Sequence, residues 1–204
     1  MIIKAVVFDY GQVISFPQDP QVVGELAKLA GVEREKFEPV LWSERKEYDR
    51  GMIDAKTYYK NILSYFSVSL DERIMDKMIA VDLASWQYIN SETVALMEDV
   101  KKAGYLLGIL SNMPYEFLAW ARKNIPVFSL PHKSLFSCEV KLIKPDEAIY
   151  RRLLSMFGVK GGELVFFDDN SDNVRSARNL GIEAFLWKDP VNARHDLSTL
   201  GVIL

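Results

Sequence analysis

The chain has 204 residues, which is enough for one domain with a full hydrophobic core or for one domain that carries a sizeable insertion. It is 49% hydrophobic, and its net charge of -3 is too small to attract nucleic acid or an anionic membrane surface. The single cysteine, Cys138, excludes a disulfide within the chain and fits a reducing compartment, and no apolar run approaches the ~20 residues of a membrane span. We therefore expect a cytoplasmic protein whose partner is neither nucleic acid nor membrane.

The predicted elements begin with a strand near Ile3–Phe8, an apolar run that reads as buried on both faces. From there to about Tyr88 no convincing strand follows, and apolar residues recur at helical spacing. The predicted helices are Gln21–Ala30, Glu33–Glu47, Asp54–Tyr65 and Asp71–Ser85. Asp54 and Asp71 stand where helix N-caps belong. We expect residues 16–87 to form an inserted, all-helical cap domain.

After this insertion, strands and helices alternate. The strands are predicted near Leu106–Leu110, Leu135–Cys138, Leu164–Phe167 and Ala184–Trp187. The helices are predicted at Ser91–Ala103, Pro114–Asn124, Asp146–Phe157 and Ser171–Leu180, followed by a last helix and a short tail within Val191–Leu204. Ser91 is the expected N-cap of the first of these helices. The alternation predicts an α/β core, a Rossmann-like doubly wound parallel sheet formed by residues 1–15 and 88–204.

Acidic residues stand directly after two of the predicted strands. Asp9 follows the first strand, and Asp168 and Asp169 follow the strand Leu164–Phe167. The carboxyl ends of parallel strands meet at one edge of the sheet, and ligands bind just beyond that edge. Three carboxylates in one crevice would repel one another, so either their pKa values rise or a counter-ion such as Mg²⁺ is required. The sequence therefore predicts a Mg²⁺ site at this edge.

Four short patterns occur along the chain in a fixed order. They are Phe8-Asp9-Tyr10-Gly11-Gln12-Val13, Leu110-Ser111-Asn112, Lys144-Pro145-Asp146 and Phe167-Asp168-Asp169-Asn170-Ser171-Asp172-Asn173. In this order and at these strand ends they resemble the haloacid dehalogenase superfamily of phosphohydrolases, with the helical insertion in the place of that family's cap. The D-x-G-x-V form of the first pattern resembles a subgroup that includes bacterial sugar-1-phosphate phosphatases. The resemblance implies a Mg²⁺-dependent phosphatase whose substrate is a small phosphorylated metabolite, in particular a sugar phosphate.

The resemblance also implies a nucleophile and a set of metal ligands. Asp9 would attack phosphorus and form an aspartyl-phosphate, which divides one difficult displacement into two easier ones. Mg²⁺ would be held by Asp9, the backbone carbonyl of Gly11 and Asp169. Asp168 would act from outside the ligand set, on a metal-bound water or on a neighbouring lysine. Asn173 matches a position that often holds an acid, and it would orient metal-bound water.

Three residues would complete a phosphate site. The hydroxyl of Ser111 and the backbone N–H of Asn112 would donate to phosphoryl oxygens at the end of the second strand. Lys144 would supply a fixed cation that offsets negative charge in the transition state. On the cap, Arg45 and its neighbours Tyr48 and Arg50 are candidates for choosing the substrate, although a solvated helix end with internal charge pairs is an equally good interpretation.

One position departs from the usual family pattern. Most phosphatases of this type carry a second aspartate two residues after the nucleophile, which acts as general acid and then as base. Here that position is Gly11, and such help is typically worth ~10²–10⁴-fold in rate. Its absence favours an activated phosphate ester, a slow enzyme or a lost activity.

Two alternatives remain open from the sequence. A haloacid dehalogenase of the same superfamily needs neither metal nor general acid, which would fit Gly11, but such enzymes generally lack the acidic pair Asp168 and Asp169. The other alternative is a catalytically weak member that serves as a binding or regulatory module. The presence of all four patterns argues against it, because a decayed site has no reason to keep them together.

Overall fold

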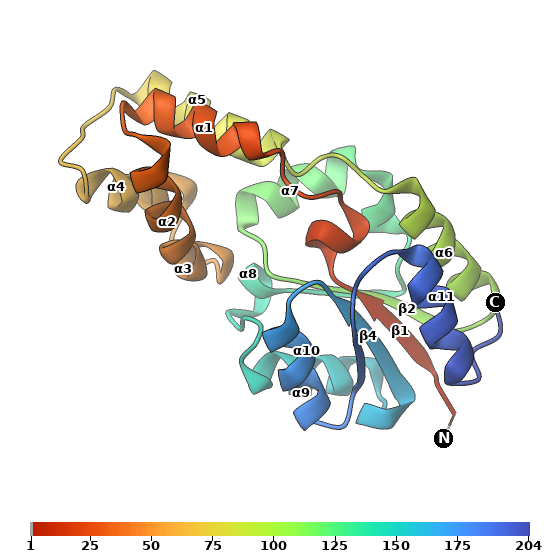
Figure 1. Ribbon diagram of the computed structural model, residues 1–204. Helices are drawn as coiled ribbons and strands as arrows, with labels where there is room; N and C mark the ends of the chain where they lie inside the picture. The colour runs from red at the N-terminus through yellow and green to blue at the C-terminus, as the bar shows by residue number, and fades with distance from the viewer. Residues whose placement is uncertain (1) are drawn as a thin grey trace.

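The computed structural model describes residues 2–204 and has a parallel β-sheet at its centre (Figure 1). The strands follow one another across the sheet in the order β3-β2-β1-β4-β5. Their bounds are β1 Ala5–Phe8, β2 Leu106–Ser111, β3 Lys133–Phe136, β4 Leu164–Asp168 and β5 Glu183–Leu186. The chain moves outward from β1 to β3 and then returns to place β4 on the other side of β1, so the direction of winding changes between β1 and β4. The predicted Rossmann-like, doubly wound α/β core is confirmed.

Helices cover both faces of the sheet. They are α6 Ser91–Lys102, α7 Tyr115–Asn124, α8 Ser137–Val140, α9 Glu147–Phe157, α10 Ser171–Asn179 and α11 Pro190–Thr199. Val6 and Phe8 of β1 belong to a core cluster with α6, α7 and α11, whereas Ala5 and Val7 belong to the cluster with α9 and α10. All four side chains are fully buried. Burial on both faces explains why the strands read as continuous apolar runs without alternation.

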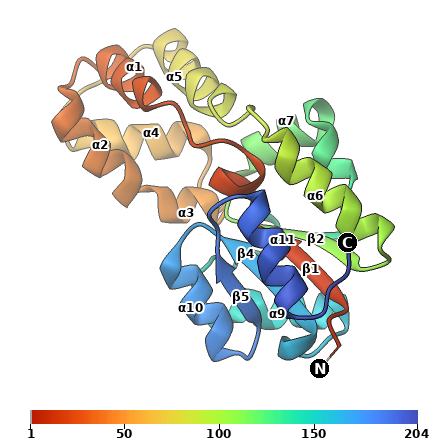
Figure 2. The same cartoon turned by 45° about the vertical axis from the view of Figure 1, so that its right-hand side comes forward.

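The segment between β1 and α6 is helical and has a core of its own. Its helices are α1 Pro20–Ala30, α2 Arg34–Ser43, α3 Arg45–Asp49, α4 Ala55–Ser64 and α5 Glu72–Ala84. Their buried side chains, among them Leu26, Phe37 and Ile62, form a separate hydrophobic cluster. Figures 1 and 2 both show these helices beyond the carboxyl ends of the strands, with α3 nearest to the sheet.

Two stretches of chain join this helical segment to the sheet. The first stretch begins after the turn η1 (Tyr10–Ile14), which Asp9 separates from β1. Ser15 and Ile89 form an isolated antiparallel bridge, and the backbone N–H of Phe16 donates to the carbonyl of Tyr88 at 2.8 Å. The two stretches therefore run side by side. Within residues 2–204, no helix is both long enough and apolar enough to cross a membrane.

The helix ends agree with most of the capping predictions. Asp54 and Asp71 accept hydrogen bonds from backbone N–H groups in the first turns of α4 and α5. The prediction of Ser91 as an N-cap is wrong by one residue, because the side-chain oxygen of Asn90 accepts the backbone N–H groups of α6. The single helix predicted over Glu33–Glu47 is divided in two at Glu44, where the chain ends α2 and begins α3.

Candidate active site

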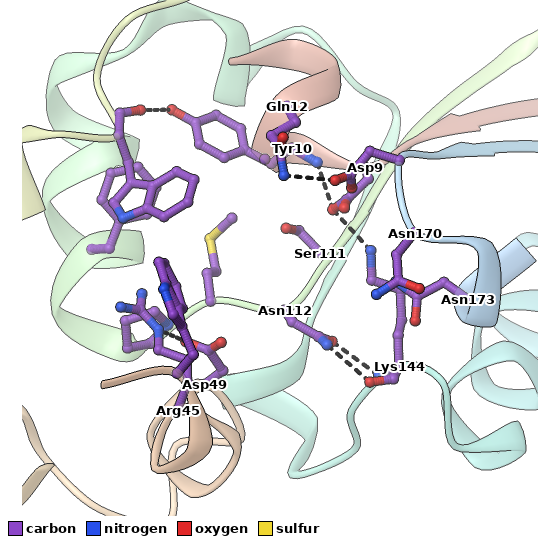
Figure 3. Close-up of a pocket in the computed structure, with 17 residues that line it drawn as sticks. Asp9, Tyr10, Gln12, Arg45, Asp49, Ser111, Asn112, Lys144, Asn170 and Asn173 are labelled. Carbon is purple, nitrogen blue, oxygen red and sulfur yellow. Dashed lines mark hydrogen bonds and ion pairs between the residues drawn. The ribbon is translucent and has the colours of Figure 1, made fainter. Parts of the chain in front are cut away.

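The functional side chains predicted from the sequence gather beyond the carboxyl ends of β1, β2 and β4. Asp9 follows β1, Ser111 ends β2 and Asp168 ends β4. The direction of winding changes between β1 and β4, and open α/β sheets bind ligands at such a point. A cavity of about 360 Å³ opens there, lined by residues from the sheet edge and from the helical segment (Figure 3). This volume is near the lower end of the range for small-molecule sites and suits a compact substrate.

Asp9 is a buried carboxyl group in the wall of this cavity. Its Oδ1 accepts the backbone N–H of Tyr10 at 2.6 Å and lies 2.9 Å from Nζ of Lys144. Within residues 2–204 no donor contacts Oδ2, which is the oxygen left for a metal ion or a phosphorus atom. Burial raises the pKa of Asp9 to about 7, and the charges of Asp168 and Asp169 add to this rise while Lys144 opposes it. A further cation next to Asp9 would therefore stabilise its ionised carboxylate.

Lys144 provides a fixed positive charge between two acids. Its Nζ lies 2.6 Å from Oδ2 of Asp168 and 2.9 Å from Oδ1 of Asp9, and it also donates to the carbonyl of Leu110 at 3.3 Å. Burial by itself lowers the pKa of Lys144, but the two carboxylates outweigh burial and the net shift is upward. The ammonium group therefore stays charged although it is almost completely buried.

The side chain of Asn112 holds the loop that carries Lys144. Its Oδ1 accepts the backbone N–H of Lys144 at 2.9 Å, and its Nδ2 donates to the backbone carbonyl of Lys144 at 3.0 Å. Figure 3 shows these two parallel hydrogen bonds below Ser111. The sequence suggested only the backbone N–H of Asn112 as a functional group, so this contact of its amide side chain was missed. It fixes the lysine at the cavity while Ser111, itself buried, lines the same wall.

Asp168 has no free oxygen to offer a metal ion. Oδ2 accepts the ammonium of Lys144, and Oδ1 accepts the backbone N–H of Asn170 and the amide of Asn173, each at 2.9 Å. The side chain is fully buried. This saturation suits a group that positions Lys144. Asn173, which the sequence suggested as an orienting group for metal-bound water, has its amide directed at Asp168 instead.

Oxygen ligands for a metal ion are available next to this pair. Carboxylate oxygens of Asp9, Asp168 and Asp169 lie within 4.8 Å of one another, and because protein donors occupy Asp168, the candidate ligands are Asp9 and Asp169. Burial, together with the charge of Asp168, raises the pKa of Asp169, so this carboxylate also lacks full charge compensation. Oδ2 of Asp169 accepts a hydrogen bond from Nε2 of Gln12 at 2.7 Å. A cluster of three acids with one lysine, beside the backbone of Gly11, has the oxygen-rich and anionic character that Mg²⁺ prefers.

Arg45 lies at the opposite wall of the cavity, on the helical segment (Figure 3). Its guanidinium is already paired, with Nε 2.8 Å from Asp49 and Nη1 3.1 Å from Asp82. The rings of Tyr48 and Tyr58 flank it at 5.3 and 5.8 Å. Burial lowers the pKa of Arg45, but the two carboxylates raise it by a larger amount, so the net shift is upward. The group is therefore a permanent cation.

The other two residues suggested for substrate choice lie farther from the cavity. Tyr48 is buried in the helical core and stacks on Tyr58 with ring centroids 4.6 Å apart. Arg50 is paired with Glu47 at 3.3 Å and with Asp146 at 3.0 Å, and it therefore joins the helical segment to the start of α9. Of the three residues, the structure brings Arg45 to the cavity wall. A part for Tyr48 and Arg50 in choosing the substrate stays a prediction.

Two tryptophans, Trp42 and Trp86, line the cavity. Trp42 is 41% exposed, and Trp86 is partly buried, with its backbone carbonyl accepting the hydroxyl of Tyr10 at 2.6 Å. Within residues 2–204 the indole N–H of Trp86 has no hydrogen-bond partner. No local signal in the sequence separates these tryptophans from Trp120, because their position depends on how the helical segment lies against the sheet.

Most of the chain matches a known protein family. Residues 3–181 of the chain match the haloacid dehalogenase-like hydrolase family. The chain belongs to this family. Among curated relatives, Phosphatase MT3486 of Mycobacterium tuberculosis is 25% identical over 214 residues, an alignment that covers 100% of this chain and 98% of the relative.

Solved structures of the family share the fold of this hydrolase. A HAD-like family hydrolase from Porphyromonas gingivalis has a TM-score of 0.77 at 22% identity, covering 100% of both chains. A HAD family enzyme from Bacteroides thetaiotaomicron, solved with magnesium and inorganic phosphate, has a TM-score of 0.69 at 22% identity, covering 91% of this chain and 94% of that one. The L-2-haloacid dehalogenase RSc1362 has a TM-score of 0.70 at 21% identity, with 91% and 86% covered. At these identities the likeness establishes the fold.

Gly11 lies in the wall of the cavity, two positions after Asp9. Its φ of -63° suits any residue, so backbone conformation does not demand a glycine. A Cβ at this position would lie 3.6 Å from the ring of Trp86, which is ordinary van der Waals contact. The missing side chain is therefore neither a consequence of strain nor of a direct clash. The next residue, Gln12, does adopt a positive φ of 59°, and this turn directs its side chain to Asp169.

Proposed function

We propose that this hydrolase is a Mg²⁺-dependent phosphatase that releases phosphate from a small phosphorylated metabolite, a sugar phosphate, through an aspartyl-phosphate at Asp9. The observation that carries the proposal is the arrangement around Asp9. One of its carboxylate oxygens is held by Lys144 and by a backbone N–H, and the other faces a cavity shared with Ser111 and Asp169. The full-length similarity to a mycobacterial phosphatase supports the same reaction class.

The proposed reaction has two displacements at phosphorus. First, a carboxylate oxygen of Asp9 attacks the phosphorus atom, and the bond between phosphorus and the ester oxygen breaks. The alcohol leaves with this bond's electron pair and takes a proton from water. Second, a water molecule attacks the phosphorus of the aspartyl-phosphate, and the bond from phosphorus to Asp9 breaks. The attacking water gives its proton to solvent, which replaces the proton that the alcohol took in the first step. Inorganic phosphate is released, and the free carboxylate is restored.

The residues of the chain act on charge and position in these steps. Lys144 offsets the charge that builds up on the phosphoryl oxygens, while Asp168 and Asn112 keep it in place. The hydroxyl of Ser111 and the backbone N–H of Asn112 donate to the phosphoryl oxygens. Asp9, Asp169 and the carbonyl of Gly11 would hold Mg²⁺, which supplies positive charge that keeps an anionic phosphate next to an anionic nucleophile.

The absence of a side chain at Gly11 restricts the class of phosphate ester that we expect the enzyme to hydrolyse. Without a side chain at this position the departing oxygen receives no proton from a neighbouring acid, so an ester with a good leaving group is favoured. An anomeric hydroxyl of a sugar is such a group. We propose in addition that residues 16–87 act as a cap domain that closes the cavity over the sugar, since Trp42 and Arg45 line it from that side.

The acidic pair Asp168 and Asp169 favours this phosphatase over a dehalogenase, despite the shared fold. Carboxylates crowded at this strand edge repel one another, which is useful only where a metal ion is to be bound. Removal of a halide requires no such ion. A purely binding or regulatory role gives no reason for the buried contact of Lys144 with both acids.

The test is phosphate release from a panel of sugar, acyl and nucleotide phosphates, measured with Mg²⁺ and with EDTA. The wild type should turn over at least one sugar phosphate with Mg²⁺ and lose this activity in EDTA. Asp9→Asn should be inactive, whereas Asp172→Asn, an exposed acid on α10, should keep wild-type activity. Silence of the wild type across the panel would contradict the proposal.

A further inference from the structure

The wall of the cavity opposite Asp9 carries a compact ionic cluster. Arg45 is paired with Asp49 at 2.8 Å and with Asp82 at 3.1 Å, and all three side chains are mostly shielded from solvent, at 13%, 15% and 3% exposed. Within residues 2–204 neither acid has another salt-bridge partner. One guanidinium therefore faces two carboxylates. The cluster holds one surplus negative charge when all three groups are ionised.

Of the two acids, Asp49 is the one that reaches the cavity. Asp49 lines the cavity together with Arg45, and Figure 3 shows both residues across it from Asp9, with Ser111 and Asn112 between. The contact with Arg45 is made to Oδ1 of Asp49, and within residues 2–204 no donor reaches its Oδ2. Burial raises the pKa of Asp49 even though Arg45 opposes the rise. A further hydrogen-bond donor at Oδ2 would stabilise this carboxylate.

Contacts to the core hold Asp49 at this wall. Its backbone carbonyl accepts the hydroxyl of Ser137 at the start of α8. A few residues later, the backbone N–H of Ala55 donates to Glu116 on α7 at 2.8 Å. Asp49 therefore faces the cavity from a segment that is tied to the core at Asp49 and again at Ala55, and little ordering is needed when a ligand arrives.

We propose that Asp49 is a specificity-determining residue, whose free carboxylate oxygen accepts a hydrogen bond from a hydroxyl group on the organic part of the substrate. The surplus negative charge beside it rejects substrates that carry a second anionic group at that end. Arg45 is held by its two acids and serves to position Asp49, so it is not the receptor for a second phosphate. This inference rests on the proposed function, because it assumes that the phosphate of the ester lies at Asp9.

The physical basis is the burial of this ionic cluster, which limits the screening of its charges by water. A neutral hydroxyl group gains from a hydrogen bond to a charged acceptor, and such bonds are among the stronger ones in proteins. An anionic group would instead meet a net negative cluster in surroundings where charges are poorly screened. The apolar ring of Trp42 lines the same cavity and offers a surface on which the carbon face of a sugar can pack. A hydroxyl-rich monophosphate meets all of these conditions.

Three probes test the inference: a hexose 1-phosphate, tetrahydropyran-2-yl phosphate and a hexose 1,6-bisphosphate. Tetrahydropyran-2-yl phosphate has the same ring and the same anomeric leaving group but no hydroxyl group. The variant is Asp49→Asn, which keeps the shape of the side chain and removes its charge. The control is Asp76→Asn, which removes an exposed carboxylate from α5 that does not line the cavity. Steady-state kcat and KM are measured for each combination.

We expect Asp49→Asn to lower kcat/KM for the hexose 1-phosphate by about 10- to 100-fold, mainly through KM, in keeping with the loss of a charged hydrogen bond. The value for tetrahydropyran-2-yl phosphate should stay within about twofold, because this ester has no hydroxyl group that could lose a hydrogen bond. The preference for the monophosphate over the bisphosphate should shrink, because the charge that repels the second phosphate is removed. Asp76→Asn should behave as the wild type.

Equal losses for the hexose and tetrahydropyranyl esters would overturn the inference and make Asp49 a structural residue. An unchanged preference against the bisphosphate would overturn the charge argument. These outcomes differ from a failure of the proposed function, in which the wild type hydrolyses neither ester. Retained turnover of tetrahydropyran-2-yl phosphate by Asp49→Asn also shows that the variant is folded.

Discussion

Nζ of Lys144 lies 2.6 Å from Oδ2 of Asp168, and both side chains are almost completely buried. On its other side the same ammonium lies 2.9 Å from Asp9. Lys144 thus links an acid that faces the cavity to an acid whose oxygens are all occupied by protein donors. Stability and activity are therefore coupled at this one side chain.

Replacement of Lys144 by alanine should damage both properties. A buried carboxylate left without its partner typically costs ~3–5 kcal/mol of stability, and loss of a donor to the transition state costs ~10²–10³-fold in kcat. Urea unfolding and phosphate release measure the two effects. Lys188→Ala, at an exposed position after β5, should leave both unchanged. A Lys144→Ala protein as stable as the wild type would show that the ion pair with Asp168 does not hold this site together.

Asp9 should make the metal-free protein less stable as the pH rises. Its pKa is raised from 3.8 to about 7 in the folded state, so between these values the folded protein keeps a proton that the unfolded chain has lost. The contribution of Asp9 to the free energy of unfolding is therefore fully present below about pH 4 and is lost progressively up to about pH 7. The free energy of unfolding falls by at most ~1.4 kcal/mol per pH unit in this range. Unfolding of the wild type and of Asp9→Asn is compared in EDTA from pH 4 to pH 8.

The other titrating groups are common to both proteins, so the difference between the two unfolding curves isolates Asp9. Asp9→Asn should gain stability relative to the wild type as the pH increases. Parallel curves for the two proteins would mean that Asp9 titrates near its ordinary value, and that burial does not act on it as the structure indicates.

Mg²⁺ should raise the melting temperature of the wild type through Asp169. A ligand at 100 times its Kd stabilises a folded protein by ~2.7 kcal/mol. Asp169→Asn should abolish the increase, whereas Asp172→Asn, three positions later and exposed on α10, should retain it. Asp168→Asn should still respond to Mg²⁺ but start from a lower stability, because it loses its contact with Lys144. Equal Mg²⁺ responses of the Asp169 and Asp172 variants would place the metal elsewhere.

Gly11→Asp should extend the enzyme to esters with poor leaving groups. The backbone accommodates a side chain, and the new Cβ makes only ordinary contact with Trp86. A carboxylic acid here could give a proton to the departing oxygen, help that is worth ~10²–10⁴-fold in suitable enzymes. We expect kcat on an alkyl phosphate to rise at least ~10-fold. Gly11→Asn, which has the same shape without a comparable acid, should show no such rise, and equal rates for the two variants would refute the role of proton donation.

The parts of this site that are local in sequence could be predicted from it. The apolar run before Asp168 and Asp169 predicts a buried strand. An acid at the end of this strand must lie at the carboxyl edge of the sheet. The position of the N-cap at Asn90 shows the limit of such reasoning, because Asn90 and Ser91 are both good capping residues and only the backbone angles distinguish them. The break at Glu44 was equally hidden, since neither a glycine nor a proline stands at it.

Contacts between distant segments could not be predicted in this way. Gln12 bonds to Asp169 across 157 positions, and Asn112 bonds to Lys144 across 32 positions. Both contacts require the relative placement of two loops, which periodicity and motif spacing do not contain. Arg45 illustrates the same point, because its neighbours in sequence suggested either a substrate-facing residue or a helix end with internal charge pairs. Its pairing with Asp82, 37 positions away, follows only from the fold.

The most direct test of the account is the stereochemical course at phosphorus. A phosphate monoester that is made chiral by oxygen isotopes is hydrolysed by the wild-type enzyme, and the configuration of the transferred phosphoryl group is determined with an alcohol as acceptor. Two displacements, first by Asp9 and then by the acceptor, predict net retention of configuration. Net inversion would mean a single direct displacement and would contradict an aspartyl-phosphate at Asp9.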